Sequence, residues 1–180
     1  KARVSSGATG VATKKPEYIL NLEASTVLKH ILEGKGYKVI MTRESHDVNI
    51  SNSERAIFAN NNKADMVVRV HADSLNNPGK TGASILIPAK ESKYTTAIYE
   101  DSQNCANLIS SKMKEAGIKV NGVFERGDLT GFNWSQVPVV LVEMGFLSNY
   151  TEDQMMSNPE YQTKLMQAIS DGLDEYFANK

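Results

Sequence analysis

The sequence has little of several features that would assign it at once to a class of protein. One cysteine in 180 residues excludes an internal disulfide framework. The 20 basic residues nearly balance the 21 acidic ones and are scattered along the chain, which disfavours a nucleic-acid-binding function. No apolar run approaches the length of a membrane span, and the first residues show no signal-peptide pattern. We therefore expect no membrane span, and any targeting segment to have been removed.

The hydrophobic pattern, by contrast, is informative about the fold. Helical and strand patterns alternate, the strands read as nearly continuous apolar runs, and no linker divides the chain. This combination predicts a single α/β domain over residues 1–180, with a mostly parallel central sheet and helices on both faces. Residues 1–15 read as a surface loop. The expected helices are 16–35, 52–61, 92–116, a short one from 151 and one from 159, and the expected strands are 37–42, 66–71, 83–88, 128–132 and 138–143.

Polar side chains stand at the ends of two of these strands. The apolar run 139–142 leads directly to Glu143, and the run 66–70 leads to His71 and Asp73. Burying an ionised carboxylate without a partner costs several kcal/mol or raises its pKa. A lone Glu or His at a strand end is more often structural, but ligands gather at strand ends in open α/β sheets. The combination of an imidazole and a carboxylate suggests hydrolytic chemistry.

A further carboxylate and the remaining histidines allow more than one interpretation. Glu17 lies in the first turn of the first expected helix, where spacing alone favours a carboxylate that complements the helix dipole. His30 and His46 lie among polar residues and are expected at the surface. Only His71 follows a buried strand. A histidine with a carboxylate suits zinc, whose catalytic sites take three protein ligands and keep one position for water.

Six short motifs are found at the segments 17–22, 42–43, 53–60, 64–65, 70–74 and 142–149. In order and spacing they resemble those of the zinc-dependent N-acetylmuramoyl-L-alanine amidases of the Amidase_3 family. The resemblance covers essentially the whole chain. It implies that Glu17 and His71 bind zinc and that Glu143 is the catalytic residue, so that Glu17 does more than complement a helix dipole.

The chain departs from the family pattern at two points. The third zinc ligand of the family is a histidine that follows an N-terminal strand, and neither His30 nor His46 stands at that position. We therefore expect that this chain lacks the first strand of the domain and that an upstream segment carries the third ligand. The second departure is Asp73, which stands where the family usually has asparagine and adds a negative charge near the expected metal.

The function implied by the resemblance is hydrolysis of the amide bond between N-acetylmuramic acid and L-alanine in peptidoglycan. The enzyme would be extracellular, bacterial and associated with the cell wall. An alternative is a non-catalytic module of the same fold that binds peptidoglycan or a partner. A third hypothesis is an unrelated open-sheet domain, which predicts that Glu17, His71 and Glu143 lie far apart.

Overall fold

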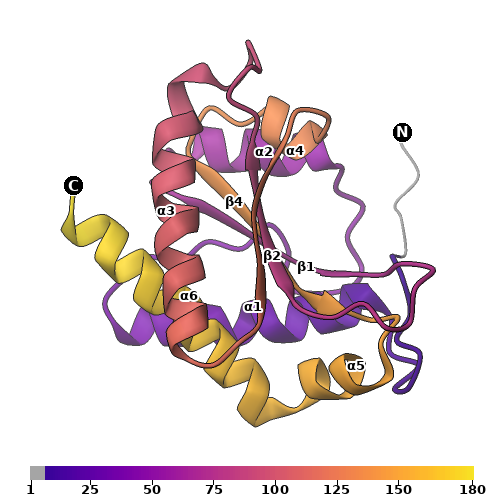
Figure 1. Ribbon diagram of the computed structural model, residues 1–180. Helices are drawn as coiled ribbons and strands as arrows, with labels where there is room; N and C mark the ends of the chain where they lie inside the picture. Colours follow the sequence, from indigo (N-terminus) through magenta and orange to yellow (C-terminus); the bar gives the residue numbers. More distant parts are fainter. Residues whose placement is uncertain (1–6) are drawn as a thin grey trace.

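A computed structural model describes residues 7–180, in which six helices surround a four-stranded sheet (Figure 1). Of the expected surface loop, residues 1–6 lie outside the described part, and residues 7–15 form an irregular loop ahead of the first helix. In the described part, no helix is long and apolar enough to cross a membrane. The elements are α1 (Glu17–Gly34), α2 (Asn52–Asn61), β1 (Val67–Asp73), β2 (Ala83–Pro88), α3 (Thr96–Glu115), β3 (Val120–Arg126), α4 (Thr130–Asn133), β4 (Val139–Phe146), α5 (Tyr150–Ser157) and α6 (Pro159–Ala178).

The sheet is mostly parallel, as the alternating pattern predicts. Its strand order is β1-β4-β2-β3. β1 runs parallel to β4 and β2 runs parallel to β3, whereas β2 and β4 are antiparallel. The register places His71 beside Glu143, so the ends of β1 and β4 bring together two residues that are distant in the sequence.

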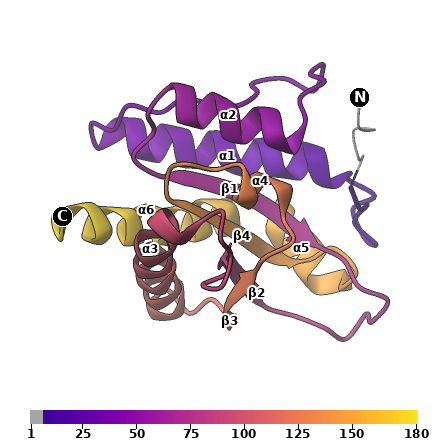
Figure 2. The ribbon, with the colours of Figure 1, turned by 90° about the horizontal axis from the view of Figure 1, so that it is seen from above.

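The two faces of β4 bury different side chains, because successive residues of a strand point to opposite faces. Val140 and Val142 belong to the main core, which α1, α3 and α6 share, and those three helices cover one face of the sheet. Leu141 lies on the opposite face and packs with Phe132 of α4, beyond which lies α2 (Figure 2). Helices on both faces were expected from the apolar character of the strands.

Local signals explain where the helices begin. Pro16 precedes α1, whose buried residues recur at every fourth position and so form one stripe against the core. Ser51 and Glu54 form the capping box that opens α2, as the sequence predicts. Pro159 opens α6, and the side chain of Asn158 accepts hydrogen bonds from its first turn. The short helix α5 is capped by Asn149, two residues before the expected start.

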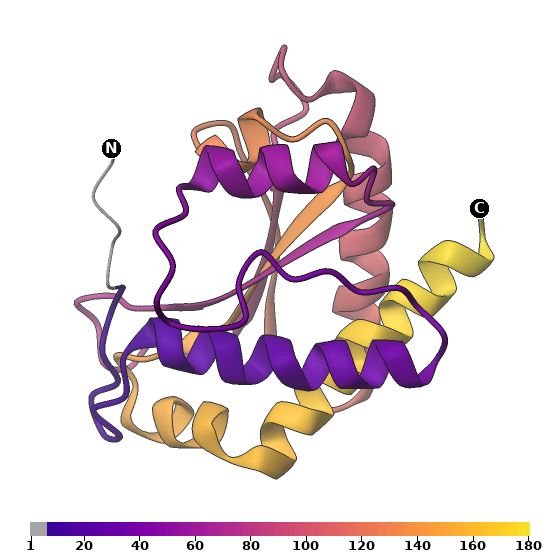
Figure 3. The same cartoon turned by 180° about the vertical axis from the view of Figure 1, so that it is seen from behind.

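The predicted strand 37–42 is wrong. This segment is irregular and crosses the open edge of β1 between α1 and α2 (Figure 3). Backbone amides and carbonyls form a strand only where a neighbouring strand supplies hydrogen-bond partners. Among residues 7–180, β1 pairs with β4 alone, and a cavity lies between β1 and the irregular segment. Residues 37–42 therefore have the residue types of a strand, but in the described part of the chain no neighbouring strand pairs with them.

The predicted strand 128–132 is also wrong. The third strand of the sequence is β3, which ends at Arg126, and the short helix α4 follows it. β3 lies at the edge of the sheet and none of its residues is buried. Its mixture of polar residues and Gly122 therefore lacks the apolar run that marks the interior strands. The apolar side chain of Phe132 instead fills the space between α4 and the sheet.

Candidate functional site

Glu17 and His71 meet at the end of β1 that lies nearest the start of α1. Glu17 Oε1 is 3.1 Å from His71 Nδ1 and also accepts a hydrogen bond from the amide of Ala72 at 3.3 Å. Burial opposes ionisation of Glu17, but the hydrogen bond and charge of His71, together with further donors, hold the pKa of Glu17 below its ordinary value. Glu17 is therefore an ionised carboxylate held against an imidazole.

The loop before α1 fixes the second oxygen of Glu17. The amide of Ala8 donates a hydrogen bond to Glu17 Oε2 at 3.3 Å. The same loop is attached to α5 through Asp153, a fully buried residue whose carboxylate accepts hydrogen bonds from the amides of Ala12 and Thr13 at 2.8 and 2.7 Å. The Thr13 hydroxyl donates a third, at 2.9 Å. Asp153 thus holds the segment that leads into Glu17.

Asp153→Ala is expected to destabilise the fold by about 2 kcal/mol, because it removes the acceptor of three hydrogen bonds, from the amides of Ala12 and Thr13 and from the Thr13 hydroxyl. The free energy of unfolding in urea measures the loss. Asp47→Ala, at an exposed loop position, is the matched control and should change stability by less than about 0.5 kcal/mol. Equal stability of the two variants would show that Asp153 does not hold the loop.

Glu143 lies beside His71 in the register of β1 and β4. Among residues 7–180, no group forms a hydrogen bond with its buried Oε2 atom. Burial, assisted by the negative charges of Asp73 and Glu17, raises the pKa of Glu143 to about 8. Such a carboxyl group changes its charge near neutral pH, which is the property required of a general base or acid.

A largely buried arginine lies on the same face of the sheet. Arg69 donates a hydrogen bond from Nη2 to Asn52 Oδ1 at 2.8 Å, and burial, with the nearby charge of Arg55, lowers its pKa to about 10. Gly131 of α4 lies directly over the guanidinium, since a Cβ atom there would collide with Arg69 Nη1. The positive charge of Arg69 lowers the pKa of Glu143 and so partly opposes the effect of burial.

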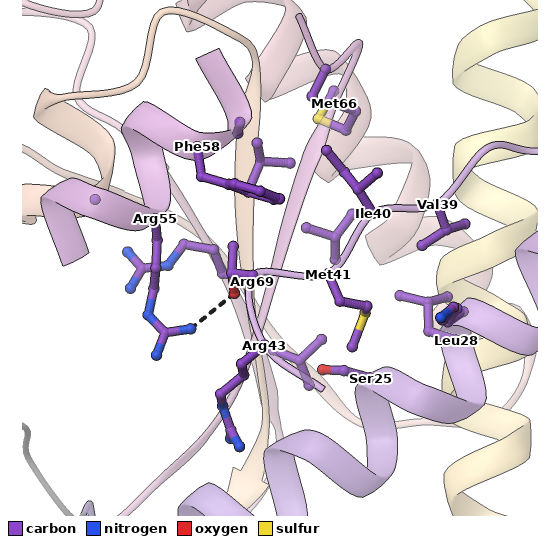
Figure 4. Close-up of a pocket in the computed structure, with 18 of the residues that line it drawn as sticks. Ser25, Leu28, Val39, Ile40, Met41, Arg43, Arg55, Phe58, Met66 and Arg69 are labelled. Atoms are coloured by element: carbon purple, nitrogen blue, oxygen red, sulfur yellow. Dashed lines mark hydrogen bonds between the residues drawn. The ribbon is translucent and has the colours of Figure 1, made fainter. Parts of the chain in front are cut away.

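A cavity of about 760 Å³ opens between β1, α1, α2 and the irregular segment 37–43. Figure 4 shows Arg43, Arg55 and Arg69 at one side of it, and apolar side chains such as Met41 and Met66 at the other. Arg55 donates a hydrogen bond to the Thr42 hydroxyl at 2.9 Å. The lining includes Glu17 and His71 but not Glu143. The cavity therefore borders the candidate site without containing the whole of it.

The residues present fit part of a zinc site. A carboxylate and an imidazole 3.1 Å apart are donor types that zinc takes, and catalytic zinc has three protein ligands. Within residues 7–180, however, no three His, Cys, Asp or Glu side chains lie close enough together to hold a metal ion. His30 and His46 are both exposed, and the ring of His46 stacks edge-on against Tyr18. Among residues 7–180, Glu17 and His71 would supply two positions of such a site.

The structure brings together the three residues singled out from the sequence. Glu17 contacts His71, and Glu143 is next to His71 across the two strands. This placement argues against the unrelated open-sheet domain, which required them to be far apart. Sequence reasoning missed Arg69, although an arginine inside an apolar strand run was an available signal. It also missed Arg126, whose charge reaches Glu143 and for which the sequence offered no signal.

Comparison with known proteins agrees with this geometry. Residues 3–175 match the family described as N-acetylmuramoyl-L-alanine amidase. The chain is 28% identical over 166 residues to a probable cell wall amidase, LytH, of Staphylococcus saprophyticus, covering 92% of this chain and 51% of that protein. It thus spans about half the length of the curated relatives that it matches first.

Solved structures show the same fold. An N-acetylmuramoyl-L-alanine amidase from Clostridium difficile 630 superposes with a TM-score of 0.87 at 26% identity, covering 99% of this chain and 92% of that one. The amidase Ami1 from Mycobacterium abscessus superposes with a TM-score of 0.83 at 28% identity, covering 96% and 84%. From the match over nearly its whole length, this chain belongs to the N-acetylmuramoyl-L-alanine amidase family.

Proposed function

We propose that this chain hydrolyses the amide bond between N-acetylmuramic acid and L-alanine in peptidoglycan, at the bacterial cell wall and outside the membrane. The observation that carries the proposal is Glu143. The chain belongs to an amidase family, and the Glu143 carboxyl group has a buried oxygen and a pKa of about 8. It lies next to His71, which contacts the second carboxylate, Glu17. No structural need within the fold accounts for placing it there.

The role of Glu143 is proton transfer. As water adds to the amide carbonyl carbon, the carboxylate takes a proton from that water. It then delivers the proton to the amide nitrogen as the C–N bond breaks, so that the muramoyl carboxylate and the free amine of L-alanine are released. The neighbouring charges of Arg69 and Arg126 favour the ionised form of Glu143 that begins this cycle.

We also propose that Glu17 and His71 are two ligands of a zinc ion. Bound zinc supplies a Lewis acid for the amide carbonyl and raises the acidity of water. Asn21 and Ala8 hold Glu17 in place through hydrogen bonds at 3.2 and 3.3 Å, and such supporting contacts orient ligands. That a third ligand is an upstream histidine remains a prediction from the family resemblance.

Zinc binding tests this part of the proposal without turnover. Glu17→Gln and His71→Gln are each expected to weaken zinc affinity by more than about 10-fold, since loss of a contact that merely supports a ligand already costs about 10–100-fold. Competition with a chromophoric chelator measures the affinity. His30→Gln, at an exposed histidine on the same helix as Glu17, is the control. Zinc affinity that is the same in all three variants would contradict the assignment.

Release of L-alanine-linked peptides from purified cell walls tests the function itself. We expect release by the wild-type chain supplied with zinc. A non-catalytic module that binds peptidoglycan is the alternative, and it is favoured by the finding that the described residues supply only two positions of the zinc site. Binding to cell walls without peptide release, in the presence of excess zinc, would support the module and contradict the amidase.

A further inference from the structure

An open strip of the sheet runs from Glu143 to the edge strand β3. The register places Glu143 beside Ser84 of β2, and Ser84 beside Gly122 of β3. Phe124 and Arg126 stand two and four residues further along β3. Because alternate residues of a strand share a face, all five belong to the face that carries Glu143. A substrate held at Glu143 can therefore extend along this strip.

Arg126 lies close enough to the candidate site for its charge to act on Glu143. Its side chain is 43% exposed, and Nε and Nη2 donate hydrogen bonds to the two oxygens of Asp128, both at 2.7 Å. These bonds fix the plane of the guanidinium and use two of its five N–H donors. The hydrogen bonds that Arg126 donates to Asp128 and the charge of Asp128, followed by the charges of Glu143 and Asp73, raise the pKa of Arg126. The guanidinium is thus oriented, accessible and within electrostatic reach of Glu143.

Phe124 supplies an apolar surface between these two charges. It is 46% exposed, which is unusual for a phenylalanine. Its ring lies over Gly122, with the nearest ring atom 3.1 Å from the position that a Cβ atom would take. A side chain at residue 122 would displace the ring. The strip therefore offers a carboxyl group, an apolar floor and a cation in that order.

This order matches the chemistry of the stem peptide, on the assumption that the proposed function holds. The second amino acid of the stem is a D-glutamyl residue linked through its side chain, so its α-carboxylate is free. One residue separates it from the scissile amide nitrogen, a span of roughly 5–7 Å in an extended chain. We propose that Arg126 binds this α-carboxylate and that Phe124 packs against the L-alanine methyl group. Arg126 is then a specificity-determining residue for stems whose second residue is not amidated.

Two muramoyl dipeptides that differ in one group test this assignment. One ends in D-isoglutamate, with the free α-carboxylate, and the other in D-isoglutamine, with a carboxamide in its place. We expect wild type to prefer the carboxylate substrate by about 10-fold in kcat/KM, which corresponds to about 1.4 kcal/mol. In Arg126→Gln this preference disappears through loss of activity on the carboxylate substrate, mainly in KM. Lys114→Gln, at an exposed position on α3, should keep it.

A binding measurement separates this inference from the proposed function. The affinities of the two product dipeptides, L-alanyl-D-isoglutamate and L-alanyl-D-isoglutamine, are measured by calorimetry and need no turnover. Carboxylate-selective binding that Arg126→Gln abolishes supports the role of Arg126 even if no substrate is hydrolysed, in which case only the proposed hydrolysis fails. Equal affinity of wild type for both dipeptides, or a preference that survives in Arg126→Gln, overturns the inference.

Discussion

Glu143→Gln is expected to lower the rate of amide hydrolysis by about 10²–10⁴-fold, the usual contribution of a positioned general acid or base. Glutamine preserves the size of the side chain but can neither accept nor deliver the proton. Since Glu143 is not one of the proposed metal ligands, zinc affinity should change much less than in Glu17→Gln. The loss should appear in kcat rather than in KM.

Two measurements make this result specific. Initial rates on a soluble muramoyl peptide give kcat and KM, and chelator competition gives the zinc affinity of the same preparation. Glu91→Gln removes a carboxylate at an exposed position between β2 and α3 and should leave both unchanged. If Glu143→Gln retained activity within a factor of a few, another group would have to carry the proton.

The parts of the fold that were predicted correctly carry local signals. β2 and α2 have the bounds that the sequence predicts, since one is an apolar run between turns and the other opens with a capping box. β1 and β4 extend two or three residues past the ends expected for them. Here the apolar run set the start of each strand, but pairing between β1 and β4 continued beyond the last apolar residue.

The parts that were predicted wrongly depend on neighbours distant in sequence. Residues 37–42 have residue types that favour a strand, but whether they form one depends on a hydrogen-bonding partner beside β1. β3 is a strand because β2 pairs with it, although its residues mix polar and apolar types and none of them is buried. Local pattern cannot report either relationship.

The residues of the candidate site also fall into two groups, those with a local signal in the sequence and those whose role depends on distant neighbours. A carboxylate after an apolar strand marked Glu143, and the end of β1 marked His71. Spacing alone indicated that Glu17 complements the helix dipole. Only the family resemblance identified it as a candidate zinc ligand. The electrostatic field around Glu143 could be predicted only in part. Asp73 was expected near the metal, but the effect of Arg69 and Arg126 on Glu143 depends on how β1 and β3 are placed around β4. Those charges decide how readily the carboxyl group ionises.

The burial that raises the pKa of Glu143 also makes its ionised form destabilising. The second large effect that we expect is therefore a dependence of the free energy of unfolding on pH. The pKa of Glu143 is about 8 in the folded chain and close to 4.5 in the unfolded chain. Between these values the folded state binds more protons than the unfolded state, so the free energy of unfolding falls as pH rises. Each pKa unit corresponds to about 1.4 kcal/mol, so the loss from pH 5 to pH 9 is on the order of 4 kcal/mol.

Urea unfolding of the metal-free protein in a chelator, at intervals from pH 5 to pH 9, measures this dependence. Glutamine cannot ionise, so Glu143→Gln should have a much flatter profile and should be more stable than wild type by several kcal/mol at pH 9. Glu17 acts in the opposite direction, since its pKa is lowered in the folded chain. Its contribution is present above its unfolded value of about 4.5 and is lost only below it. The two carboxyl groups therefore titrate in separate windows.

Taking the difference in free energy of unfolding between wild type and Glu143→Gln removes the contributions of groups that the two chains share, such as the histidines. If that difference stayed constant from pH 5 to pH 9, Glu143 would be ionised in the folded chain throughout, and burial would not control its pKa. If it grew with pH while hydrolysis was lost, one substitution would stabilise the fold and remove the activity. That pairing is expected of a group kept for its chemistry, since nothing in the packing of β4 requires a carboxylate at a position that burial penalises.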